Sequence, residues 1–220
     1  MFIEISGFLF LFIIVVVVSA TSKYGYEIFS ELDAEGQLQK IAENPRKFRT
    51  GTGLVVIEHT AIVALSITLF IAFGSYNIIL GVAWLVSRGL EGLIQIYNKK
   101  NYWGLLDIAG KYSQANDAEK ETFSELSLGI LKSKNSTFVF AQILFSVGTL
   151  SYSILFAISG VIPVIIGWFG IVASSIYGIG NAMARVRPDF KALWNVGGLL
   201  IWIFELILGG WLLVTPFIIP

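Results

Sequence analysis

The fold is decided first by a stretch of 22 residues, 53–74, with the sequence GLVVIEHTAIVALSITLFIAFG. Apart from Glu58 and His59, this stretch is almost wholly apolar. A helix needs about 20 such residues to cross a hydrocarbon core of about 30 Å. Because every backbone amide in lipid must be hydrogen-bonded within the protein, the stretch predicts a transmembrane helix.

Similar apolar runs recur along the chain of 220 residues, of which 55% are hydrophobic and only 14% charged. A soluble domain of this length needs less apolar surface, so we expect a multi-pass protein of the cell membrane. The first run follows Glu4 with no basic residue before it, which indicates a retained span and not a secretory signal. We predict an all-α, polytopic six-helix transmembrane bundle that forms one integral membrane domain over residues 1–220. Its spans are expected at about 5–21, 53–74, 76–97, 137–158, 161–183 and 194–216.

The polar connections between these spans differ in length and in charge. Those at 22–52 and 98–136 are long and carry apolar side chains at helical intervals, which predicts short amphipathic, interfacial helices. Helices that only cover the ends of the bundle would fit the same pattern. These two connections and the segment 184–193 together hold 14 of the 15 Lys and Arg residues, and the remaining one is Arg88. The positive-inside rule therefore predicts that all three are cytoplasmic and that both termini lie outside.

The expected partner is the lipid bilayer. A nucleic-acid partner is not expected, because the formal net charge of the chain is zero. A homo-oligomer or a larger membrane assembly also remains open. The fifth span carries one small residue per turn on one face, which lets a second helix approach closely. The neighbour is either another span of the same chain or a second copy. This predicted packing face consists of Gly170, Ser174, Gly178 and Ala182.

Seven polar side chains lie inside the predicted spans. A charge near the bilayer centre costs about 2.5–3.5 kcal/mol on insertion scales, so such groups normally face the bundle interior and pair. Counted from the basic face at about 1.5 Å per residue, they fall in the same half of the membrane, which allows one cluster. The candidate ligand or proton site consists of Glu58, His59, Arg88, Glu91, Gln142, Asn181 and Glu205.

The charges of this predicted cluster do not balance. Three Glu against Arg88 leave a charge of −2 when His59 is neutral, and an uncompensated buried carboxylate takes up a proton. The first hypothesis is a structural or accessory membrane subunit whose cluster fixes helix packing. The second is a small transporter or a binder of lipid or another small ligand that uses the cluster as a proton-linked or ion-linked site.

The chain lacks the residues that several classes of enzyme need. One histidine and no cysteine exclude a three-histidine zinc site and a bis-histidine haem site. The sequence has no glycine-rich phosphate loop and no serine-nucleophile elbow. We therefore predict no catalytic residue, no metal site and no cofactor. A membrane-embedded hydrolase stays open only with a nucleophile that no motif supplies.

The segment NPRKFRTGTGLVVIEHTAIVALSITLF at 44–70 resembles the second span of a family of uncharacterised prokaryotic membrane proteins, domain of unknown function 4386. In that family a Phe-Arg-x-Gly turn opens the helix, and here the matching residues are Phe48, Arg49 and Gly51. The resemblance implies six spans and a membrane location, and it implies no particular activity.

The likeness extends over essentially the whole chain. SRGLEGLIQI resembles the family's Phe-Arg-x-x-Glu/Gln helix with Arg88 and Glu91 on the matching positions, and IWIFELILGGWLLV resembles its closing segment with Glu205 on the glutamate. GWFGIVASSIYGIGNAM resembles its fifth span. This chain departs from the family at Ser87, where Phe is usual, and it lacks basic residues that the family carries before the first span. Those residues imply a cytoplasmic amino terminus, opposite to the orientation given by the charge count.

Overall fold

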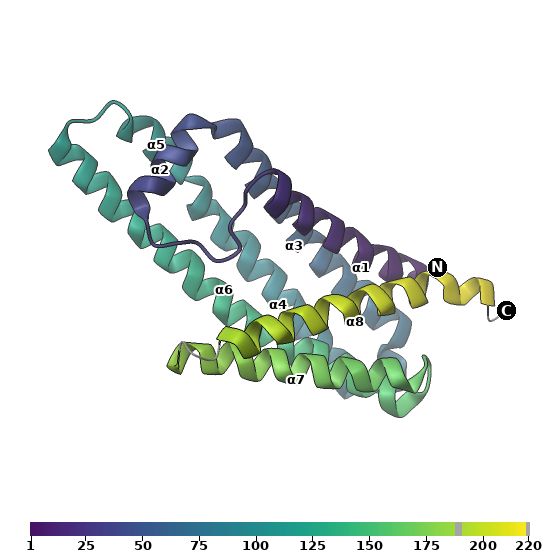
Figure 1. Ribbon diagram of the computed structural model, residues 1–220. Coiled ribbons are helices and arrows are strands. Elements are labelled where there is room, and N and C mark those ends of the chain that lie inside the picture. Colours follow the sequence, from purple (N-terminus) through teal and green to yellow (C-terminus); the bar gives the residue numbers. More distant parts are fainter. Residues whose placement is uncertain (188–190, 219–220) are drawn as a thin grey trace. The chain divides into compact units, whose positions relative to one another are not determined.

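The computed structural model describes residues 1–187 and 191–218, and nearly all of them are helical (Figure 1). The described residues contain no strand, and six helices are long and apolar enough to cross a membrane. These findings confirm the predicted all-α class and the six spans. The helices are α1 (Phe2–Val18), α2 (Ala34–Glu43), α3 (Pro45–Phe73), α4 (Ile78–Trp103), α5 (Leu105–Tyr112), α6 (Asp117–Ser159), α7 (Val164–Val186) and α8 (Lys191–Ile218), with a π-helical turn η1 (Ser19–Lys23) and a 3-10 turn η2 (Gly74–Tyr76).

Four helices begin next to a side chain that accepts a hydrogen bond from the first turn. Such caps satisfy backbone N–H groups that have no partner within the helix. At the start of α6 the Glu119 carboxylate also accepts the Asn116 N–H at 3.0 Å, which completes a capping box. The capping residues are Asp33 for α2, Asn44 for α3, Asn77 for α4 and Asn116 for α6, each bonded at 3.0–3.2 Å by the N–H three residues later.

Two helices extend well beyond the predicted spans. α3 begins at Pro45 where the span was expected near residue 53, and α6 begins at Asp117 where it was expected near residue 137. With 43 residues, α6 is about 65 Å long, roughly twice the thickness of a hydrocarbon core. Asn44 and Asn116, which cap α3 and α6, lie before the polar segments that precede the two apolar runs. The helices therefore begin at these caps and include the polar segments.

The chain forms two compact units, each with its own hydrophobic core. Unit 1 comprises Met1–Ile14, Thr60–Leu93 and Phe140–Pro220, and unit 2 comprises Val15–His59 and Ile94–Val139. The single membrane domain predicted over residues 1–220 stays a prediction.

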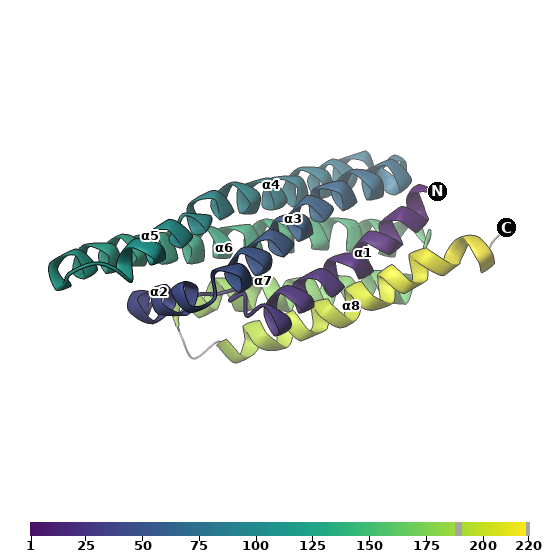
Figure 2. The same ribbon diagram turned by 90° about the horizontal axis from the view of Figure 1, so that it is seen from above.

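In unit 1, α8 lies beside both α7 and α1 (Figures 1 and 2). Glycines permit the close approach: a Cβ at Gly180 of α7 would lie 2.7 Å from the backbone nitrogen of Trp194 in α8. A Cβ at Gly7 of α1 would lie 2.6 Å from the backbone nitrogen of Leu213. Larger residues at either glycine would force the helices apart.

In unit 2, the two long connections contain the expected short helices, α2 and α5, which pack against each other. α2 buries Leu38 and Ile41, and α5 buries Leu105 and Ala109 in the same core. Their apolar faces are therefore occupied by protein.

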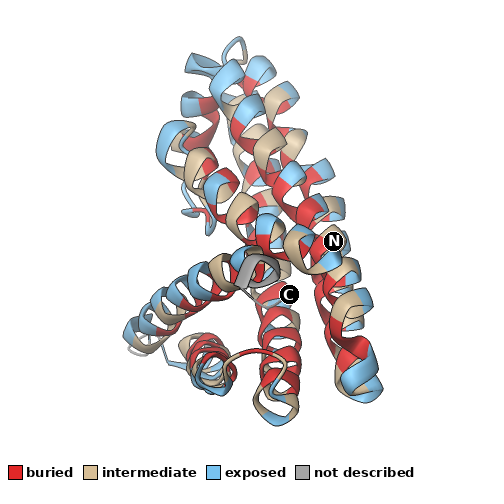
Figure 3. Ribbon diagram, turned by 90° about the vertical axis from the view of Figure 1, so that its right-hand side faces the viewer, coloured by how far each residue is buried: buried red, intermediate tan, exposed pale blue. Residues whose placement is uncertain are grey.

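The long helices bury residues along one side and expose residues along the other (Figure 3). The exposed side includes large apolar residues such as Ile79 of α4 and Ile165 of α7, each 78% exposed. Such a surface is costly in water and suits contact with acyl chains.

Candidate functional site

Arg88 and Glu91 form an ion pair within unit 1. They are three residues apart on α4 and therefore share a helical face. The Arg88 Nη1 donates to Glu91 Oε2 at 2.5 Å, and the two side chains are only 2% and 3% exposed. The guanidinium carbon also lies 4.3 Å from the ring centre of Phe145 and 5.4 Å from that of Trp84. The pair is thus enclosed by aromatic rings.

A glycine on α6 makes room for the arginine stem. A Cβ at Gly148 would lie 2.7 Å from Arg88 Cγ and 3.0 Å from its Cδ. Any larger residue at position 148 would push the arginine away from Phe145, because both contacts come from α6. Among the described residues, Arg88 Nε has no hydrogen-bond partner.

Tyr177 of α7 brings further predicted site residues to the same region of unit 1. Its hydroxyl donates to the Gln142 side-chain oxygen, and its ring packs edge-on against Phe145 at 5.5 Å. Arg88, Glu91 and Glu205 all interact electrostatically with the Tyr177 hydroxyl. We call Arg88, Glu91, Gln142, Tyr177 and Glu205 the Arg88 cluster. Asn181, one turn beyond Tyr177 on α7, is also buried in unit 1.

Glu58 and His59 belong to unit 2, so each unit holds part of the predicted set. The His59 Nδ1 lies 2.9 Å from Glu58 Oε2 and 2.7 Å from the backbone oxygen of Val55. Both side chains are buried. Two acceptors at Nδ1 favour the tautomer that carries its proton there, which leaves Nε2 with its lone pair.

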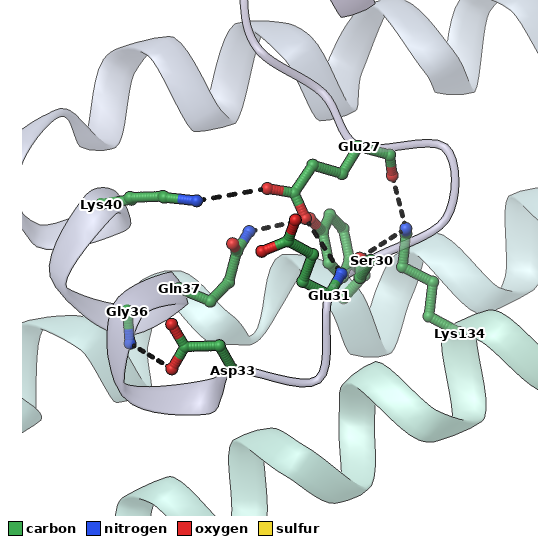
Figure 4. Close-up of polar contacts among 9 residues, drawn as sticks. Glu27, Ser30, Glu31, Asp33, Gly36, Gln37, Lys40 and Lys134 are labelled. Carbon is green, nitrogen blue, oxygen red and sulfur yellow. Dashed lines mark hydrogen bonds and ion pairs between the residues drawn. The ribbon is translucent and has the colours of Figure 1, made fainter.

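Unit 2 contains a second polar cluster, centred on Lys134 of α6 (Figure 4). The Lys134 Nζ donates to the backbone oxygens of Glu27 and Ile28 at 2.6 and 3.1 Å and to Ser30 Oγ at 2.7 Å. It also lies 5.1 and 4.9 Å from the ring centres of Tyr26 and Tyr102. Since an ammonium group has three N–H donors, every donor of Lys134 is used within the chain.

Asn135 and Lys99 complete this Lys134 cluster, which consists of Tyr26, Ser30, Lys99, Tyr102, Lys134 and Asn135. Asn135 exchanges two hydrogen bonds with the backbone of Ser30, at 2.9 and 2.8 Å. The Lys99 ammonium donates to Gln95 at 3.3 Å and lies 5.7 Å from the Tyr26 ring centre. Burial raises the pKa of Tyr26 well above its usual value of 10.0, and the neighbouring Tyr102 and Glu58 raise it further. Glu58 therefore acts on this cluster electrostatically.

Sequence reasoning missed the two buried lysines, since it assigned Lys99 and Lys134 to a solvated basic connection. The spacing of residues along α6 could have indicated that Lys134 is buried. The buried residues Ser127, Leu131, Lys134 and Asn135 follow one another at intervals that keep to one face of a helix. With these lysines included, the buried charged side chains of the described residues are three basic and three acidic. Of these, Lys99 and Lys134 belong to unit 2 together with Glu58, whereas unit 1 holds Arg88, Glu91 and Glu205.

The predicted packing face of α7 is only partly buried. A Cβ at Gly170 would lie 2.3 Å from Ser153 Oγ of α6, and one at Gly178 would lie 3.0 Å from Ser146 Cβ of the same helix. Ser174 is buried between them, whereas Ala182 is exposed. The neighbour at Gly170 and Gly178 is thus a span of the same chain.

The side chains of these clusters can form ion pairs and exchange protons. In the described part of the chain, no three His, Cys, Asp or Glu side chains lie close enough to hold a metal ion. Unit 2 also contains an open cleft of about 670 Å³, lined by residues that include Asp33, Glu35, Tyr112, Lys120 and Glu121. This cleft and the Lys134 cluster have no lining residue in common.

Six long apolar helices, with Arg88 and Glu91 paired in their interior, define an integral multi-pass membrane protein. Within this class the chain belongs to the family described as domain of unknown function DUF4386, whose model matches residues 5–215. No curated protein and no solved structure matches the chain.

Proposed function

We propose that this protein is a structural or accessory membrane subunit whose buried ionic groups fix the packing of its helices. The observation that supports this proposal is the set of contacts around Arg88. Its guanidinium pairs with Glu91 on its own helix and lies near the rings of Trp84 and Phe145, and its stem packs over Gly148 of α6. These contacts hold α4 to α6 through a side chain that costs free energy in lipid unless all of its partners are in place.

The proposal predicts that loss of the arginine charge weakens the fold itself. Arg88→Met leaves Glu91 buried without its cation, a change that costs about 3–5 kcal/mol in buried pairs. We expect a lower midpoint of thermal unfolding for the protein in lipid nanodiscs. The matched control is Arg46→Met, because Arg46 is exposed on α3. Equal midpoints for the two variants would contradict a packing role.

A second candidate function, a proton-linked or ion-linked transporter or ligand binder, is favoured by the charge of the Arg88 cluster. Glu91 and Glu205 both act on Tyr177, while Arg88 is the cluster's one basic member. One carboxyl group can therefore exchange a proton or attract a cation. The same role extends to Glu58 and His59, which form a carboxylate–imidazole pair in unit 2.

Thermal unfolding measured between about pH 5 and 8 separates the two candidates. If the cluster only fixes packing, Glu205→Gln and Glu91→Gln leave the pH dependence of the midpoint in this window unchanged. A proton-linked site gives a midpoint that depends on pH, and Glu205→Gln or Glu91→Gln removes this dependence. That second result would replace the structural role with the proton-linked one.

A further inference from the structure

The segment between η1 and α2 is not helical, and it exposes large apolar side chains. Ile28, Phe29 and Leu32 are 43%, 49% and 53% exposed. They lie in the irregular chain between Tyr24 and Asp33. We call residues 27–32 the 27–32 loop. Three such side chains on one short loop form a surface that water does not favour.

The polar backbone of this loop is turned toward α6 and is hydrogen-bonded there. Lys134 satisfies the carbonyl oxygens of Glu27 and Ile28, and Asn135 bonds both the N–H and the C=O of Ser30. Figure 4 shows the bond from Lys134 to Glu27. Packed against α6, these groups lose their water in any surroundings and need such partners. Once bonded, they no longer oppose entry of the loop into lipid, where unsatisfied backbone groups are costly.

A ring contact places the loop at the edge of the apolar run of α6. The Phe29 ring centre lies 6.5 Å from that of Phe138. In the sequence of α6, Lys132, Lys134 and Asn135 come just before Phe138, and the residues after it are apolar as far as Ala141. The loop is therefore level with the point where α6 changes from polar to apolar, which is where a membrane interface is expected.

We propose that the 27–32 loop inserts Ile28 and Phe29 into the interfacial layer of the bilayer, and that Lys134 and Asn135 hold it there. Leu32 instead lines the open cleft of unit 2. The two side chains then face the acyl boundary, while α6 bonds the carbonyl oxygens of Glu27 and Ile28 and both backbone groups of Ser30. Glu27 pairs with Lys40 at 3.5 Å, and the loop itself contains no basic residue. The loop therefore binds the bilayer by inserting its apolar side chains and does not require anionic headgroups.

The experiment uses single cysteines in the full chain, which has no native cysteine. Phe29→Cys is labelled with an environment-sensitive fluorophore and reconstituted into phosphatidylcholine vesicles that contain a lipid with a nitroxide quencher near the headgroup end of the acyl chain. Gln39→Cys is the matched control, because Gln39 is exposed on the polar side of α2. We expect loss of most of the emission at position 29 and little loss at position 39.

Equal quenching at the two positions would overturn the proposal. Crosslinking between two copies through position 29, in place of quenching by lipid, would also overturn it by assigning the apolar patch to a protein contact. Adding Ser30→Ala or Lys134→Met to the labelled Phe29→Cys protein should reduce the quenching, since each removes hydrogen bonds that hold the loop. Ser30→Ala is the milder change, and it serves if Lys134→Met does not fold. Unchanged quenching in a folded variant would contradict the holding role of α6.

Discussion

Arg88 combines three kinds of contact that act on different parts of its side chain. Its guanidinium has a carboxylate partner in Glu91, its central carbon lies 5.4 and 4.3 Å from the ring centres of Trp84 and Phe145, and its stem has space over Gly148. A cation over an aromatic ring contributes about 0.5–2 kcal/mol, depending on how far it is desolvated. The arginine is therefore held by geometry that a flexible lysine would reproduce only in part.

Tyr26 gives a residue-level prediction that depends on pH. Its pKa is raised well above 10.0, mainly by burial, so the folded protein keeps the phenol protonated where the unfolded chain loses the proton. The stabilising effect is complete below about pH 10 and is lost as the pH rises toward the folded-state pKa. We expect the unfolding midpoint to fall above about pH 10, and to fall less steeply in Tyr26→Phe. Identical alkaline profiles for the two proteins would contradict this account of Tyr26.

Among the helices, α6 allows a matched test of close packing, because two of its glycines have opposite surroundings. A Cβ at Gly148 would clash with Arg88, whereas a Cβ at Gly129 would meet nothing within 4 Å. Gly129→Ala should stabilise the helix by about 0.5–1 kcal/mol through its better helix propensity. Gly148→Ala should instead lower the unfolding midpoint in nanodiscs. The account fails for α6 if both alanines change stability in the same direction.

The same helix shows how far the sequence could predict an element. Its apolar run from 137 to 158 was recognised, because length and composition determine a span. The first 20 residues of the helix were expected to form a separate short amphipathic helix, since their apolar side chains recur at helical intervals among charged residues. The Asn116 and Glu119 capping box was a visible sign of the true start.

The candidate site was predictable to the extent that it depends on charges within spans. Arg88 and Glu91 pair as their spacing suggests, because both lie on a long helix. The Lys134 cluster was not predictable in this way, since its acceptors are backbone oxygens of the 27–32 loop. No residue pattern records which way such a loop turns its carbonyl groups.

For the whole molecule, the number of spans followed from composition, but the orientation in the membrane remains a prediction. We propose that the connections 22–52, 98–136 and 184–193 face the cytoplasm; residues 188–190 of the last one lie outside the described residues. Lys40→Cys and Ala115→Cys should then react with a membrane-impermeant thiol reagent only after the membrane is opened.

Tyr76→Cys tests the opposite side of the membrane, because Tyr76 is exposed in the short turn between α3 and α4. Gly160 is less suitable, since its φ of 66° would strain a cysteine. Tyr76→Cys should react in intact cells. The reverse labelling pattern would favour the cytoplasmic amino terminus that the family resemblance implies.

The most direct test of the packing role is a double-mutant cycle on Arg88 and Glu91, measured as the free energy of unfolding in a defined lipid or detergent environment. Each single change, Arg88→Met or Glu91→Met, leaves one buried charge without its partner, whereas the double variant leaves neither. We predict that the double variant is more stable than either single variant, with a coupling of about 1–3 kcal/mol. Additive losses with no coupling would show that the buried pair adds no stability as a pair, and would contradict the account.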